Sequence, residues 1–125
     1  MTSRATLVAA GLLLALATAC AALGAHALKS QLPADRLVLW DTAAQLHFLQ
    51  ALGLMGVGLT LRGRDGAALR ASAALIAAGL VLMPGALYAL ALGAPHALGM
   101  LTPLGGFAWI GGWLVYAFGV WRTWA

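Results

Sequence analysis

Four long apolar runs constrain the fold of this chain more than any other feature of its sequence. They cover residues 5–28, 42–61, 71–93 and 103–121. A helix of about 20 apolar residues is long enough to cross the hydrocarbon core of a bilayer. A helix also satisfies its backbone hydrogen bonds within the segment, as the core requires. The runs therefore predict four transmembrane helices.

The composition supports a membrane protein and leaves little sequence for anything else. Of the 125 residues, 63% are hydrophobic and 8% are charged, whereas about a quarter of the residues in a soluble domain are charged. We therefore expect an all-α membrane protein with one domain over residues 1–125, an antiparallel bundle of four transmembrane helices. The expected location is the cell inner membrane, and the expected partners are the lipid bilayer and a second copy or another membrane protein.

The charged residues indicate an orientation in the membrane. The net charge is +4, but the cations are scattered and form no basic stripe, so no nucleic-acid partner is expected. With four spans, most cations lie on the side that holds both termini and the second loop: Arg4, Arg62, Arg64, Arg70 and Arg122. Lys29 and Arg36 lie on the other side. By the positive-inside rule, both termini are expected in the cytoplasm, and Trp40 is expected in the aromatic belt of the opposite interface.

The first apolar run has an alternative interpretation as a signal peptide. Arg4 precedes it, and the residues from Leu16 to Cys20 loosely resemble a lipoprotein cleavage site. The run continues past Cys20 to Leu28, whereas the hydrophobic region of a signal peptide has about 7–15 residues. This length favours a transmembrane helix. The single cysteine leaves no internal disulfide.

Two stretches beside the runs predict helix ends. The segment 33–40 is too apolar for a free loop, so it predicts a short interfacial helix with a proline in its first turn. Asp41 or Thr42 would then cap the second transmembrane helix. Thr102 followed by Pro103 predicts the cap and the first residue of the fourth.

The second helix opens with a polar seam, defined here as the hydrogen-bonding side chains between Trp40 and Gln50. Gln45, His47 and Gln50 each need a partner within a bundle or a bilayer. At about 100° per residue, one stripe is small and polar and is expected to pack on a neighbouring helix. This stripe consists of Thr42, Gln45, Leu49, Gly53, Gly56 and Thr60. His47 and Gln50 lie on a second face, and the residues expected to face lipid are Ala44, Phe48, Ala51 and Met55.

The third and fourth helices are expected to complete the interior of the bundle. Pro84 displaces the carbonyl of Leu80 in the middle of the third helix, and Tyr88 lies near the depth of His47. The third helix is therefore expected to face the polar seam. Small residues allow helices in membranes to approach closely. The glycines expected in such contacts are Gly24, Gly53, Gly56, Gly105, Gly112 and Gly119.

Several short motifs occur in a set order along almost the whole chain. They are Gly24-Ala25-His26, Trp40 with Thr42-Ala43, Leu87-Tyr88-Ala89-Leu90-Ala91-Leu92, Thr102-Pro103-Leu104-Gly105-Gly106 and Gly112-Trp113. Together they resemble the family called domain of unknown function 423, a group of small bacterial inner-membrane proteins with transmembrane protein 256 as a eukaryotic relative. The resemblance implies the architecture and the membrane location but no reaction.

Two departures from the family pattern bear on function. Where family members resemble Tyr-Gln-x-x-His, this chain has Leu46-His47-Phe48-Leu49-Gln50, and where they resemble Ser-Gly-Ser, it has Pro84-Gly85-Ala86. A histidine and a glutamine that exchange places three residues apart fit a hydrogen-bonded bridge. They fit a catalytic base less well, because the position of a base is tied to one substrate atom. This argues against an enzyme.

The candidate site comprises His26, Asp41, Thr42, Gln45, His47, Gln50, Tyr88 and Thr102. The sequence favours a non-enzymatic structural or accessory membrane protein in which His47, Gln50 and Tyr88 bridge helices 1 to 3. One alternative is an oligomeric channel or transporter for protons or a small solute that uses the face of His47 and Gln50. Another is an intramembrane enzyme that uses His47 with Asp41. No cofactor and no metal are expected, because no two histidines have the spacing of a metal site.

Overall fold

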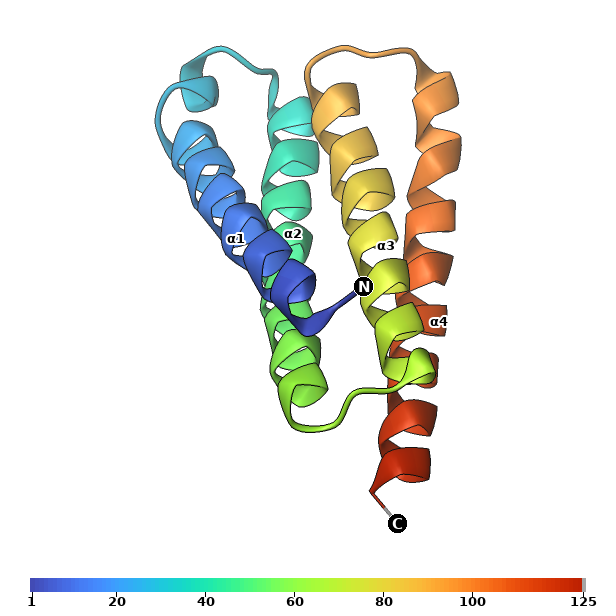
Figure 1. Ribbon diagram of the computed structural model, residues 1–125. Helices are drawn as coiled ribbons and strands as arrows, with labels where there is room; N and C mark the ends of the chain where they lie inside the picture. The colour runs from blue at the N-terminus through green and yellow to red at the C-terminus, as the bar shows by residue number, and fades with distance from the viewer. Residues whose placement is uncertain (125) are drawn as a thin grey trace.

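The computed structural model describes residues 1–124 and folds them into four long helices joined by short loops. The long helices are α1 (Ser3–Ala25), α2 (Ala34–Gly63), α3 (Ala67–Ala91) and α4 (Leu101–Thr123), and two short 3₁₀ helices, η1 (Leu28–Ser30) and η2 (His96–Met100), lie in the loops. Consecutive helices are antiparallel, and both termini lie at the end of the molecule that carries the α2–α3 loop (Figure 1). All four helices are long and apolar enough to span a membrane. The prediction of an all-α membrane protein with four transmembrane helices is thus confirmed.

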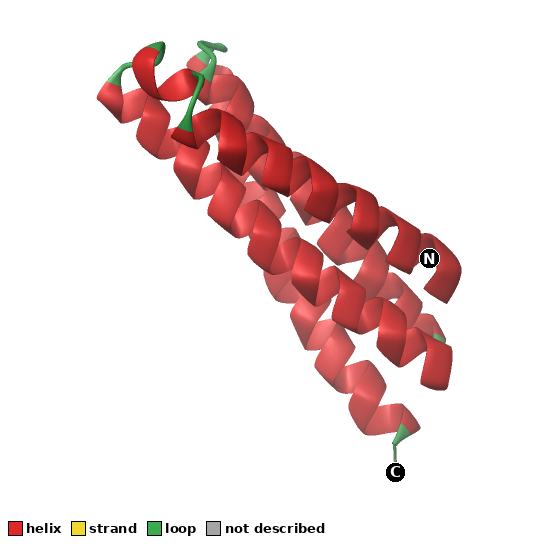
Figure 2. Ribbon diagram, turned by 90° about the vertical axis from the view of Figure 1, so that its left-hand side faces the viewer, coloured by secondary structure: helices red, strands yellow, loops and turns green. Residues whose placement is uncertain are grey.

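The helices are arranged in chain order, with α2 and α3 between α1 and α4 (Figure 1). Each helix packs chiefly on its neighbours in the sequence, and α1 touches α3 only slightly. Figure 2, which views the molecule from the side of α1, shows that the helices account for most of its length and that loops are confined to the ends. Helices α1 and α4 therefore each have a broad face that is free to contact lipid.

Helix α2 begins earlier than the sequence predicts. The separate interfacial helix expected over residues 33–40 is wrong, because these residues form the first turns of one continuous helix that starts at Ala34. Its 30 residues span about 45 Å, which exceeds the hydrocarbon core of about 30 Å. Asp41 and Thr42 therefore lie inside the helix and do not cap it. Apolar side chains upstream of them, such as Trp40 and Leu39, find partners in the bundle and extend the helix in that direction.

Helix α4 also begins before its expected cap. It starts at Leu101, directly after η2, so Thr102 lies in its first turn and is not the capping residue. A cap needs extended backbone geometry, whereas the residue before this helix, Met100, is already helical. The hydroxyl of Thr102 is buried and has no hydrogen-bond partner among residues 1–124.

The face that α2 buries differs from the face that the sequence predicts. Its buried residues recur at spacings of three and four: Trp40, Ala43, Ala44, His47, Ala51, Leu54, Val57, Gly58 and Leu61. The prediction that Ala44 and Ala51 face lipid is therefore wrong. In a bilayer a lipid tail is as apolar as leucine, so close approach of the backbones favours small alanines at a helix contact.

The small and polar stripe expected to pack on a neighbour is exposed over much of its length. Thr42, Gln45, Leu49 and Gly56 are all exposed, and the position of a Cβ on Gly56 has no other atom within 4 Å. The assignment of Gly56 to a helix contact is therefore wrong. Water or lipid headgroups can satisfy exposed polar side chains such as Thr42 and Gln45 wherever the long α2 extends beyond the hydrocarbon core.

Helices α3 and α4 interlock through glycines on both sides of their contact. On α4, Gly105, Gly112 and Gly119 are buried, and a Cβ at each of them would meet Met83, Ile76 and Leu69 of α3, respectively. On α3, Gly79 gives room to the ring of Trp109, whose Nε1 donates to the carbonyl oxygen of Ile76 at 3.2 Å. This contact is close enough that neither helix has space for a larger residue at these positions.

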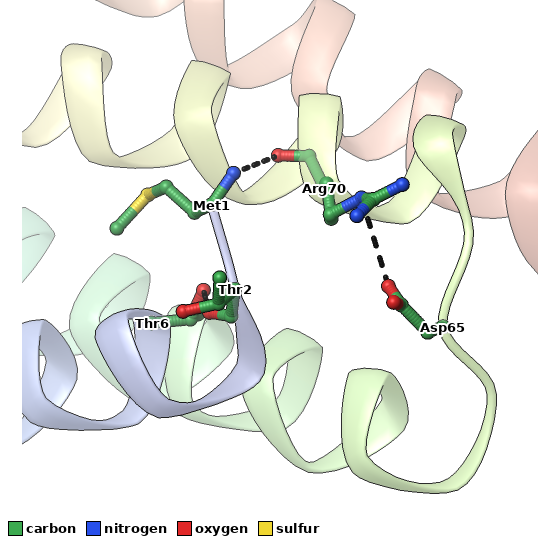
Figure 3. A network of polar contacts seen from close by, with 5 residues as sticks. All are labelled: Met1, Thr2, Thr6, Asp65 and Arg70. Atoms are coloured by element: carbon green, nitrogen blue, oxygen red, sulfur yellow. Dashed lines mark hydrogen bonds and ion pairs between the residues drawn. The ribbon is translucent and has the colours of Figure 1, made fainter.

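The end of the molecule with the termini carries a small polar network (Figure 3). The amino group of Met1 donates to the carbonyl oxygen of Arg70 at 3.4 Å, and Nε of Arg70 lies 3.6 Å from a carboxylate oxygen of Asp65. The hydroxyl of Thr6 donates to the carbonyl oxygen of Thr2 at 2.7 Å. The ion pair is exposed and contributes about 0–1 kcal/mol, so the network places the start of α1 near α3 without anchoring it strongly.

Candidate functional site

His47 of the polar seam pairs with Tyr88 of α3. The side chain of His47 is buried, with 2% of the residue exposed. Its Nδ1 lies 3.0 Å from the hydroxyl oxygen of Tyr88, so one hydrogen bond joins α2 to α3. The two rings meet edge to face, with 5.9 Å between their centroids. The structure therefore brings together the histidine and the tyrosine that the sequence placed at one depth, with α3 facing the seam.

Trp40 connects this pair to α1. Its ring lies against that of Tyr88, with centroids 4.6 Å apart, and its Nε1 donates to the backbone carbonyl of Cys20 at 2.7 Å. Trp40 is 6% exposed, so the expectation that it belongs to an aromatic belt at the membrane surface is wrong. The absence of a side chain at Gly24 creates the space for its indole, because a Cβ at Gly24 would lie 2.8 Å from the ring.

Sequence reasoning missed this role of Trp40, although the sequence contains a signal for it. Cys20 and Gly24 are small residues one helical turn apart, and Trp40 lies on the next transmembrane helix. A small gap on one helix beside a large aromatic on its antiparallel neighbour is the pattern of a ring packed into a groove. The indole N–H must then find an acceptor inside the bundle, and an α1 carbonyl provides it.

Gln50 belongs to a different helix contact. Its side-chain oxygen accepts a hydrogen bond from Nε1 of Trp113 at 2.9 Å, which joins α2 to α4. Gly53 allows this approach, because a Cβ there would overlap the indole of Trp113. Farther along the same two helices, the hydroxyls of Thr60 and Tyr116 lie 3.0 Å apart. Gln50 therefore does not join His47 and Tyr88 in one bridge between helices 1 to 3.

The other predicted site residues lie outside this interior. His26 is exposed at the end of α1, and Asp41, Thr42 and Gln45 are exposed on α2. Asp41 and Gln45 line an open groove of about 430 Å³ between α1 and α2. Asp41 makes no hydrogen bond to His47, so the geometry gives the imidazole no carboxylate partner among residues 1–124. Over those residues, no group of three His, Cys, Asp or Glu side chains is placed to hold a metal ion.

The remaining unsatisfied atom of the seam is Nε2 of His47. It is buried, and it has no hydrogen-bond partner among the described residues. The other ring nitrogen is engaged by the hydroxyl of Tyr88, and the thiol of Cys20 on α1 lies beside that hydroxyl. Chemically, the arrangement is suited to joining helices.

Comparison with known proteins gives a consistent set of similarities. The family described as "Protein of unknown function (DUF423)" matches residues 20–106. The UPF0382 membrane protein YwdK of Bacillus subtilis is 39% identical over 80% of this chain and 82% of its own length. The UPF0382 membrane protein of Haemophilus influenzae is 35% identical over 83% of this chain and 86% of its own length.

A further relative is similar over nearly the full length of both chains. The UPF0382 inner membrane protein YgdD of Escherichia coli is 30% identical over 98% of this chain and 93% of its own length. No solved structure matches. The relatives share a description as membrane proteins, in agreement with the four membrane-spanning helices.

Proposed function

Because this chain belongs to the DUF423 family, whose relatives are described as membrane proteins, we propose that it is a non-enzymatic structural or accessory protein of the inner membrane. It acts through the faces that it presents to lipid, to a second copy or to another membrane protein. One observation carries the proposal. Two pairs of polar side chains inside the bundle join helices, His47 with Tyr88 and Gln50 with Trp113.

The separation of these two pairs is the step that favours a structural role. A path for protons or solutes needs polar groups in succession along one channel. Here one pair lies between α2 and α3 and the other between α2 and α4. The polar groups of these two pairs therefore each serve the helix contact beside them, which is the usual use of polar side chains between membrane helices.

The proposal also includes an orientation of the chain in the inner membrane. Arg4, Arg62, Arg64, Arg70 and Arg122 lie at the end of the molecule with the termini, and Lys29 and Arg36 lie at the opposite end. The positive-inside rule then places both termini in the cytoplasm. A cysteine at Ser30 should react with a membrane-impermeant maleimide in intact spheroplasts, while one at Asp65 should react only after permeabilisation. The reverse pattern would show the opposite orientation.

A transport assay tests the structural role against the channel alternative. Purified protein is placed in liposomes that contain a pH-sensitive dye, and a potassium gradient with valinomycin drives proton entry. We expect the same proton flux for the wild type, for His47→Gln and for liposomes without protein, over a range of protein-to-lipid ratios. Flux that rises with protein content and disappears in His47→Gln would contradict the proposal.

The accessory role itself is tested in native membranes. If the chain acts through its faces, chemical crosslinking before solubilisation should give defined species larger than the 12.8 kDa monomer, and blue-native electrophoresis should give the same species. A cysteine in place of Leu12, which is exposed on α1, offers a crosslinking position on such a face. If cysteines at exposed positions such as Leu12 gave no crosslinked species and only the monomer was observed, the protein-binding part of the proposal would be overturned and lipid would remain as the partner.

A further inference from the structure

The groove between α1 and α2 combines charged, polar and aromatic side chains in an order that follows membrane depth. Its lining residues belong to the last turns of α1, to η1 and to the first half of α2, at the end of the molecule opposite the termini, and its volume is about 430 Å³. Lys29 and Asp41 line it together with Gln45 and Phe48. Along α2, Gln45 lies about 6 Å and Phe48 about 10 Å deeper in the membrane than Asp41, at 1.5 Å per residue. The groove therefore changes from charged to amide to aromatic as it descends.

The two charges of the groove are both available to a ligand. Neither Lys29 nor Asp41 makes an ion pair within residues 1–124, where the ion pair present is the distant one of Arg70 with Asp65. Asp41 lies against the backbone of α1, because a Cβ at Gly24 would be 2.8 Å from its carboxylate oxygen. The groove thus presents one carboxylate beside α1 and one ammonium on a long side chain, with no net charge.

A ligand that matches this order has a cation and an anion at one end and an apolar chain at the other. We propose that the groove binds a zwitterionic phospholipid with a primary amine in its headgroup. The amine donates to the carboxylate of Asp41, the phosphate accepts from Lys29, and the amide of Gln45 donates to an ester carbonyl. An acyl chain then follows Phe48 along the lipid-facing surface, where Leu49 and Leu52 are exposed.

The charges also predict which lipids the groove rejects. A trimethylammonium headgroup has no N–H and cannot donate to Asp41, so a choline lipid loses that hydrogen bond. An anionic headgroup without an amine places its phosphate near Lys29 but leaves Asp41 without a partner and close to a like charge. The inference depends on the membrane location alone, and it stands or falls separately from the accessory role and from the orientation proposed above.

Native mass spectrometry of the full chain in detergent measures this preference. The probes are dioleoyl lipids that differ in the headgroup alone: phosphatidylethanolamine, phosphatidylcholine and phosphatidylglycerol. We expect the wild type to bind the ethanolamine lipid about fivefold more tightly than either of the others, the upper range for one partly exposed charge pair. Equal binding of the three lipids by the wild type would overturn the proposal without any variant.

Matched variants locate the site. Asp41→Asn should lose most of the preference for the ethanolamine lipid over the choline lipid, because a neutral amide oxygen accepts more weakly than a carboxylate. Asp41→Glu should keep the preference. Asp35→Asn is the control, because Asp35 lies on the same helix and is exposed but lines a different pocket. Lys29→Gln should weaken both zwitterionic lipids, with Arg36→Gln as its control. Loss of the preference in Asp35→Asn to the same extent as in Asp41→Asn would contradict the assignment to this groove.

Discussion

Replacement of Gly105 by alanine is expected to destabilise the bundle by about 1–3 kcal/mol, the range for overpacking a close contact. The added Cβ would lie 2.6 Å from both the backbone nitrogen and the Cβ of Met83 and 3.0 Å from its Cα. These atoms belong to the α3 backbone or are attached to it, so they cannot rotate away as the end of a flexible side chain can. Helices α3 and α4 must instead move apart, which weakens the glycine contact along their length.

The neighbouring glycine provides a matched control for this experiment. A Cβ at Gly106 would meet no atom within 4 Å, so Gly106→Ala adds the same methyl group to the same helix without a clash. The free energy of unfolding, measured by titration with a denaturing detergent in mixed micelles, should fall for Gly105→Ala and stay the same or rise slightly for Gly106→Ala. Equal effects of the two changes would show that the α3–α4 contact is less close than described.

Truncation of Leu54 to alanine is expected to destabilise the protein by about 2 kcal/mol, the low end for a buried leucine. Leu54 is completely buried in the core cluster, with 0% of the residue exposed. In a bilayer the transfer part of this cost is small, because lipid is as apolar as the core. The lost dispersion contacts and the cavity remain, and they should dominate the effect.

The control for Leu54 lies two residues away on the same helix. Leu52 is 48% exposed toward lipid, so Leu52→Ala removes the same atoms from a place where acyl chains can fill the space. Unfolding in mixed micelles should therefore be shifted by Leu54→Ala and little changed by Leu52→Ala. A comparable loss in both variants would mean that α2 is rotated relative to the orientation described.

The four spans were predictable because their length and composition act locally. A run such as 71–93 has to cross the bilayer whatever it packs against, and the structure places α3 at Ala67–Ala91. The similar depth of His47 and Tyr88 was also predictable, since the rise per residue of a helix places both side chains at one level before any contact is known. Family membership followed from motifs such as Thr102-Pro103-Leu104-Gly105-Gly106, and the match over residues 20–106 confirms it.

Which side of α2 is buried in the bundle could not be predicted from the sequence, for a physical reason. In water an apolar stripe identifies the buried side of a helix, but in lipid both sides of the helix are apolar. Polar residues do not resolve the question either, because Gln45 is exposed while His47, two residues later, is buried and pairs with Tyr88 inside the bundle. Gln50 shows the same limit, since its partner Trp113 lies 63 residues later in the chain, at a separation that sequence spacing does not encode.

The packing of each helix on its predecessor in the chain has a consequence for biogenesis. When α2 enters the bilayer, its main partner α1 is already there, and α4 likewise finds its main partner α3 in place. Helix α3 packs on α2 as it enters but makes its larger contact with α4, which follows it. Each helix can thus pack on the one before it in the order of synthesis, but α3 completes its packing only when α4 is inserted. The links of Gln50 to Trp113 and of Thr60 to Tyr116 join α2 to α4 across the chain order, so they require the insertion of α4 before they can form.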